Sequence, residues 1–238
     1  MARQTKDFKY SKNINGKLAL GYGSKYQLLR MLGWHREDFT NKVKNAISYD
    51  GNIKWLDFIY DGNCDAELLN VDFISSLKDK WRATWACGKK GLNWDAVGLA
   101  DDGTYIFVEA KAHLSEFDHM DSDGSSLSSK ETHIECIRKV LVKYSIECDE
   151  EKWLNKYYQI ANRIVITDFM IENGYKAKLV YVLFENGYEY NRPTNDSASS
   201  EEWNDAFNHA IKELGIKGTS LESFISKCII NCNQKQGC

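Results

Sequence analysis

One acidic and one basic side chain, Glu109 and Lys111, lie two residues apart in a strand-like segment in the middle of the chain. This segment, 104–112, is rich in Val, Ile, Phe and Tyr, and an Asp-Asp-Gly turn sequence separates it from a similar run, 94–99. Two such runs joined by turn residues predict a β-hairpin. Successive side chains point to opposite faces of a strand, so Glu109 and Lys111 share one face. With Asp95 on the paired strand, two carboxylates and one ammonium group converge.

These three groups have the chemistry of a metal-assisted hydrolytic site. Two carboxylate oxygens, helped by a backbone carbonyl, suit a hard divalent ion such as Mg²⁺ or Mn²⁺. Such an ion holds a phosphate oxygen, acidifies a bound water and neutralises charge that develops on phosphorus. A neighbouring lysine orients or deprotonates the water and stabilises the transition state. The residues therefore predict Asp95 and Glu109 as metal ligands and Lys111 as their catalytic partner.

A structural interpretation of the same residues stays open. Glu109 and Lys111 can form an ion pair on an exposed sheet face, where such pairs are common and weakly stabilising. Asp95 can equally serve as a turn or capping residue. His113 continues the same strand face, and we expect it to be peripheral to the site.

The pattern Asp95, hairpin, Glu109-Ala110-Lys111 resembles the catalytic signature of the PD-(D/E)XK nuclease superfamily, which has the restriction-endonuclease-like fold. The segment 157–163 also looks like the helix that follows this motif in some uncharacterised bacterial members. Trp94 stands where the nominal proline of the motif would be. The resemblance covers roughly residues 65–184.

This resemblance implies a mixed sheet flanked by helices, with the first acid and the E-x-K motif on adjacent central strands. It also implies a magnesium- or manganese-dependent nuclease that hydrolyses phosphodiester bonds, with DNA as the first expectation and RNA left open. Many members use a further acid from the preceding helix, for which Glu37 and Glu67 are both candidates. A non-catalytic nucleic-acid- or protein-binding domain that retains the fold is the alternative.

Substrate contacts are expected from a basic segment that precedes Asp95. Five positive side chains and one opposing aspartate lie within 78–90, interleaved with Trp81 and Trp85. Basic groups neutralise phosphates and aromatic rings stack on bases, although the tryptophans fit a protein core equally well. The candidate substrate-binding residues are Lys89, Lys90, Gln159, Asn162 and Arg163.

The composition excludes several other classes of protein. The chain has 238 residues, 43% of them hydrophobic, and a net charge of −3, so it is neither disordered nor broadly basic. No apolar run approaches the roughly 18 residues that span a bilayer. The first residues are polar, without the apolar stretch of a signal peptide, which predicts a cytoplasmic location. Seven cysteines, with no CxxC pair, are expected to be reduced thiols rather than zinc ligands or disulfides.

Hydrophobic periodicity predicts a single α/β domain in which helices and strands alternate. We assign 65–184 to the nuclease-like core, and 1–64 and 185–238 to helical N- and C-terminal elaborations. The oligomeric state, a homodimer included, stays open. The predicted helices are 24–33, 39–47, 65–81, 128–144, 149–169 and 199–215. Besides the hairpin, the predicted strands are 55–58 and 176–184, with a last short element at 228–230.

Overall fold

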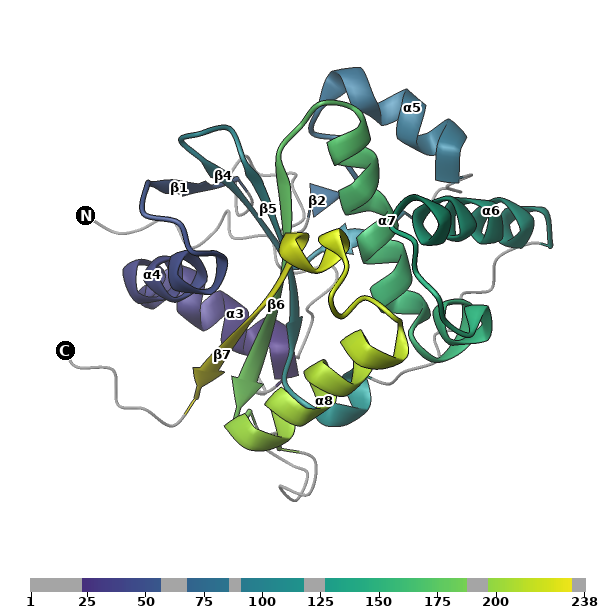
Figure 1. Cartoon of the computed structure of the whole chain (residues 1–238). Coiled ribbons are helices and arrows are strands. Elements are labelled where there is room, and N and C mark those ends of the chain that lie inside the picture. Colours follow the sequence, from purple (N-terminus) through teal and green to yellow (C-terminus); the bar gives the residue numbers. More distant parts are fainter. Residues whose placement is uncertain (1–22, 57–67, 86–90, 118–126, 188–196, 233–238) are drawn as a thin grey trace.

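A mixed five-stranded sheet forms the centre of the molecule (Figure 1). The computed structural model describes residues 23–56, 68–85, 91–117, 127–187 and 197–232. The strands, in sheet order, are β1 (Ile53–Trp55), β4 (Ala96–Ala100), β5 (Tyr105–Lys111), β6 (Ala177–Glu185) and β7 (Ile225–Asn231). β4 is antiparallel to both β1 and β5, whereas β6 is parallel to both β5 and β7.

Helices cover both faces of this sheet (Figure 1). One face carries α3 (Gly23–Trp34) and α4 (Arg36–Ile47), whose Leu28 and Phe39 pack with Val108 of β5. The other face carries α5 (Ser75–Trp85), α6 (Leu127–Lys143), α7 (Tyr158–Glu172) and α8 (Ser200–Glu213). The α/β class and the helix-flanked mixed sheet are therefore confirmed. In the described part of the chain, no helix is both long and apolar enough to cross a membrane.

The predicted hairpin is present, and its two faces differ as the alternation requires. Gly103 in the turn has a φ of 85°, a left-handed conformation that glycine adopts without strain. On β5, Val108 and Ala110 pack toward α3 and α4, whereas Phe107 packs on the opposite side beneath α7. Glu109 is on the α7 side with only 3% of its surface exposed. The charged pair is thus buried between sheet and helices, so the exposed-face interpretation is wrong.

The helix predicted over 65–81 is shorter than expected. Leu68–Leu69 instead forms β2, which pairs with β3 (Asn93–Trp94), and helix α5 begins only at Ser75. Asn70 is the cause, because its φ of 48° is incompatible with a continuing right-handed helix. Its side-chain oxygen also accepts hydrogen bonds from the Leu92 backbone amide (2.9 Å) and the Trp81 indole (3.2 Å).

The long helix predicted over 149–169 is divided in two. A π-helical turn, η3 (Lys152–Lys156), precedes α7, and Tyr157 between them has a non-helical backbone conformation. Within η3, the Trp153 indole donates to the Leu214 carbonyl oxygen at 3.0 Å. Apolar periodicity does not distinguish a π-turn from an α-turn, so sequence patterning missed this change.

Both segments that we expected to elaborate the core add an edge strand to the sheet. β1 pairs with β4 at one edge, and β7 pairs with β6 at the other. Between β6 and β7 lie α8, whose predicted Ser199–Glu202 capping box is present, and the 3₁₀ helix η4 (Ser220–Phe224). A second 3₁₀ helix, η2 (Leu114–Glu116), follows β5.

Two cysteines near the end of the chain are buried thiols. Cys228 and Cys232 are 4% and 8% exposed, and burial raises the pKa of each to about 12. Because the thiolate is the reactive species, we expect iodoacetamide at pH 8 to alkylate them at least about 100-fold more slowly in the folded than in the unfolded protein. Peptide mapping by mass spectrometry measures both rates, and equal rates would contradict this burial.

Candidate active site

A buried cluster of one carboxylate and two cations lies between β5 and α7. Oε1 of Glu109 is 2.9 Å from Nζ of Lys111, and Oε2 of Glu109 accepts a hydrogen bond from Nε of Arg163 at 2.7 Å. Lys111 and Arg163 are 7% and 6% exposed. Glu109 and Lys111 come from one face of β5, and Arg163 comes from the helix that covers this face. The cluster therefore links sheet and helix.

Asp95 joins this cluster from the bend that precedes β4. It occupies a bend between β3 and β4 and is half-buried. Its Oδ2 accepts a hydrogen bond from the backbone amide of Ala110 at 2.6 Å, and its own amide donates to the Val108 carbonyl oxygen at 3.2 Å. These bonds place the carboxylate beside the Glu109–Lys111 segment, as the hairpin predicts.

Glu109, Lys111 and Arg163 keep one another ionised. Burial acts to raise the pKa of Glu109, but the positive charges of Arg163 and Lys111 outweigh it and hold that pKa below its usual value. Burial likewise opposes protonation of Lys111, yet the Glu109 and Asp95 carboxylates raise its pKa above that of a free lysine. Two negative and two positive charges thus balance within the cluster.

Helix α7 supplies the other predicted contacts from its first two turns. Nζ of Lys111 donates to Oε1 of Gln159 at 2.7 Å, which orients the ammonium group. Arg163 lies one helical turn further along and faces the same strand. Asn162 is buried beside it, and its Oδ1 accepts a hydrogen bond from Nη1 of Arg163 at 3.4 Å. Gln159, Asn162 and Arg163 are therefore part of the cluster or border it.

Several other predicted residues do not join the site. Glu37 is exposed on α4, across the sheet from Glu109, which removes it as the additional acid. The other candidate acid, Glu67, and the basic residues Lys89 and Lys90 lie outside the described residues. His113 follows β5, and its Nε2 atom lies 3.9 Å from Oε1 of Glu116. It forms no ion pair or hydrogen bond with Glu109 in the described part of the chain.

The tryptophans of the basic segment belong to the core. Trp81 and Trp85 are 0% and 4% exposed and stack on each other, so a role in stacking on bases is wrong. On the same helix, Arg82 forms an ion pair with Asp72, and Lys80 donates a hydrogen bond to Asn173. Two of the basic side chains in the described part of this segment are thus engaged with neighbouring side chains.

Two further polar groups near the cluster were missed in the sequence. The Glu116 carboxylate, in the turn after β5, acts electrostatically on Lys111. Tyr181 pairs with Glu109 in the parallel β5–β6 register, and its buried hydroxyl has no hydrogen-bond partner among the described residues. The alternation of side chains along β6 could have placed Tyr181 on one face of that strand. The pairing of β6 with β5, which brings Tyr181 next to Glu109, was not predictable from local sequence.

The donor atoms suit a hard divalent ion in type, but one of the two carboxylates is already occupied. Asp95 and Glu109 offer carboxylate oxygens, the ligands that Mg²⁺ and Mn²⁺ prefer. In the structure, however, Lys111 and Arg163 take both oxygens of Glu109. Among the described residues, no group of three or more His, Cys, Asp or Glu side chains is arranged to hold a metal. A metal ion at Glu109 would therefore share the carboxylate with these two cations or replace one of them.

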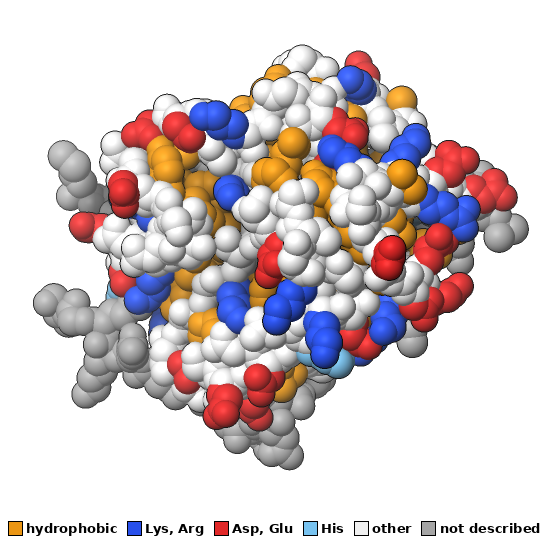
Figure 2. All heavy atoms as spheres, viewed as in Figure 1, with side chains coloured by type: hydrophobic (Ala, Val, Ile, Leu, Met, Phe, Trp, Pro, Cys, Tyr) orange, Lys and Arg blue, Asp and Glu red, His pale blue; other side chains and the backbone are white. Residues whose placement is uncertain are grey.

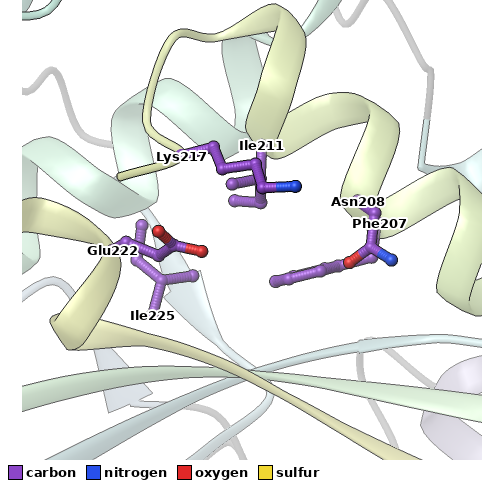
Figure 3. A pocket seen from close by; sticks show the side chains of 6 residues that line it. All are labelled: Phe207, Asn208, Ile211, Lys217, Glu222 and Ile225. Carbon is purple, nitrogen blue, oxygen red and sulfur yellow. The ribbon is translucent and has the colours of Figure 1, made fainter. Parts of the chain in front are cut away.

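A separate pocket lies away from this cluster, between α8 and the start of β7. Its volume is about 80 Å³, and Figure 3 shows its lining side chains, which are Phe207, Asn208, Ile211, Lys217, Glu222 and Ile225. On the surrounding face, basic and acidic side chains are interspersed rather than segregated (Figure 2). This pocket contains none of the predicted site residues.

Comparison with known proteins identifies no relative. No family model matches the chain, and neither a curated protein nor a solved structure shows significant similarity to it.

Proposed function

We propose that this chain is a metal-dependent phosphodiesterase that acts on nucleic acid, with DNA as the first substrate to test. The observation that carries the proposal is the convergence of Asp95, in the bend before β4, with Glu109 and Lys111 on the adjacent strand β5. Gln159 holds the lysine. Buried ionisable groups in mutual contact are candidates for catalysis. Asp95 adds a second carboxylate beside the Glu109–Lys111 pair, with its Oδ2 atom bonded to the Ala110 backbone amide.

The arrangement of elements supports the resemblance to the restriction-endonuclease-like fold. In the β4–β5 hairpin, the first acid directly precedes β4 and the E-x-K motif lies on β5. Helices α6 and α7 follow, and the next strand, β6, pairs in parallel with β5. We therefore propose a restriction-endonuclease-like core for this sheet. Because no comparison supplies a relative, this assignment rests on topology and on the three motif residues.

Each residue has a defined role in the proposed site. Asp95 and Glu109 would hold Mg²⁺ or Mn²⁺, which supplies charge neutralisation at the phosphate and acidification of water. Lys111 would place a positive charge where negative charge develops on the phosphate oxygens. Its hydrogen bond to Gln159 fixes the direction of the ammonium group, so less reorganisation is needed when the substrate binds.

One contact favours the second candidate, a non-catalytic binding domain that retains the fold. Arg163 pairs with Oε2 of Glu109 at 2.7 Å, and this pair gives the carboxylate a structural partner without any metal. A protein that had lost catalysis could keep such a pair for stability alone. The two candidates differ in whether a divalent ion binds and whether bonds are cleaved.

An assay on the full-length protein separates them. Supercoiled plasmid, linear duplex DNA, single-stranded DNA and single-stranded RNA are incubated with the protein in Mg²⁺, in Mn²⁺ and in EDTA. The phosphodiesterase proposal expects cleavage of at least one substrate in a divalent ion and none in EDTA. Salt-sensitive DNA binding without cleavage under any condition would support the binding domain instead.

A further inference from the structure

Arg163 is fixed in place by contacts on several sides. Besides Glu109, its guanidinium donates from Nη2 to the backbone carbonyl of Asn93 at 3.0 Å and lies 5.1 Å from the centre of the Trp94 ring. These partners belong to β3 and β5, whereas Arg163 itself belongs to α7. The arginine is therefore a built-in cation of the cluster and not a mobile surface side chain.

This cation occupies a position that a metal bound to Glu109 would need. Nε of Arg163 takes Oε2 of Glu109, Nζ of Lys111 takes Oε1, and both cations also interact electrostatically with Asp95. In a buried site, a fixed positive charge a few ångströms away strongly disfavours a divalent cation. The charge of the arginine therefore opposes a divalent ion at Oε2 of Glu109.

We infer that Arg163 sets the metal affinity of the site by competing with the divalent ion for Oε2 of Glu109. The inference rests on the proposed metal-dependent function and adds a residue to it. Arg163 acts as a positioning residue that holds Glu109 ionised and in place before the metal binds. Metal binding at Oε2 then weakens the hydrogen bond from Nε of Arg163, whose Nη2 is also bonded to the Asn93 carbonyl oxygen.

Removal of the competing charge is expected to tighten metal binding. In Arg163→Met, the dissociation constant for Mn²⁺, measured by isothermal titration calorimetry, should fall by about tenfold or more. Arg163→Lys, which keeps a positive charge, should bind Mn²⁺ much as the wild type does. Arg138→Gln is the matched control, because Arg138 is an exposed arginine that pairs with Glu150 on another part of the surface.

A measurement on the wild type does not depend on whether Arg163→Met folds. The Nε–H resonance of Arg163 in a ¹⁵N–¹H spectrum, assigned by its absence from Arg163→Lys, reports its bond to Glu109. Titration with the diamagnetic ion Mg²⁺ should shift this resonance at the same concentrations at which the ion binds.

The outcomes separate the inference from the proposed function. Tighter Mn²⁺ binding in Arg163→Met, with Arg138→Gln unchanged, supports competition. Equal affinity in Arg163→Met and the wild type, or an Arg163 resonance that stays constant while Mg²⁺ binds, overturns the inference and leaves the metal site intact. If neither the wild type nor Arg163→Met binds Mn²⁺, both the inference and the metal-dependent function fail.

Discussion

The substitution Lys111→Met is expected to lower the rate of metal-dependent phosphodiester cleavage by about 10²- to 10⁴-fold. Methionine keeps much of the length and volume of the lysine side chain but removes the ammonium group. In the structure this group is 7% exposed and is aimed by Glu109 and Gln159. Because Arg163 still pairs with Glu109 in this variant, we expect the fold to be retained. The measurement is the initial rate on whichever DNA or RNA the wild type cleaves.

Lys176→Met provides the matched control for this prediction. Lys176 is an exposed lysine that pairs with Asp102 at the turn end of the same hairpin, far along β5 from Lys111. Its removal should leave the rate within about twofold of the wild type, since exposed ion pairs contribute little. An active Lys111→Met protein would show that the ammonium group takes no part in catalysis.

The substitution Glu109→Ala is expected to destabilise the folded protein by about 3–5 kcal/mol. It leaves Lys111 and Arg163, two buried cations, without the carboxylate that both contact. Their hydrogen bonds to Gln159 and to the Asn93 carbonyl oxygen remain, but neither partner carries a charge. The measurement is the free energy of unfolding from urea denaturation, followed by circular dichroism.

Glu116→Ala is the matched control for Glu109→Ala. It also removes one carboxylate, beside the cluster, from a side chain that is 30% exposed. Its carboxylate lies 3.9 Å from His113 and is open to solvent, so the loss should be about 0–1 kcal/mol. Equal destabilisation by Glu109→Ala and Glu116→Ala would mean that water reaches Glu109 and that the cluster is not buried.

Local patterns were sufficient to predict the hairpin and the faces of its strands. The Asp-Asp-Gly turn and the alternation over 104–112 correctly placed Glu109 and Lys111 on one face and Asp95 beside them. The capping box at Ser199 and Glu202 likewise predicted the start of α8. These features depend on residues close together in sequence, where periodicity and capping chemistry act directly.

Features that depend on distant partners were not predictable in this way. The contact between Glu109 and Arg163 joins residues 54 positions apart, and it exists because α7 packs across β5 and β6. Helical spacing could place Arg163 near the edge of the site but not on Oε2 of Glu109. The burial of the cluster and the short β2–β3 pairing that replaces the start of a predicted helix follow from tertiary packing too.

The central claim, that Asp95 and Glu109 form a divalent-metal site, is tested most directly by calorimetric titration of Mn²⁺ into the wild type, Asp95→Asn and Asp102→Asn. The first substitution keeps the size of the side chain and removes its charge, while Asp102 is an exposed acid at the other end of the hairpin. We predict that the wild type and Asp102→Asn bind Mn²⁺ with the same affinity and that Asp95→Asn binds it at least about tenfold more weakly. Equal binding by all three proteins, or binding by none, would contradict the proposed metal site.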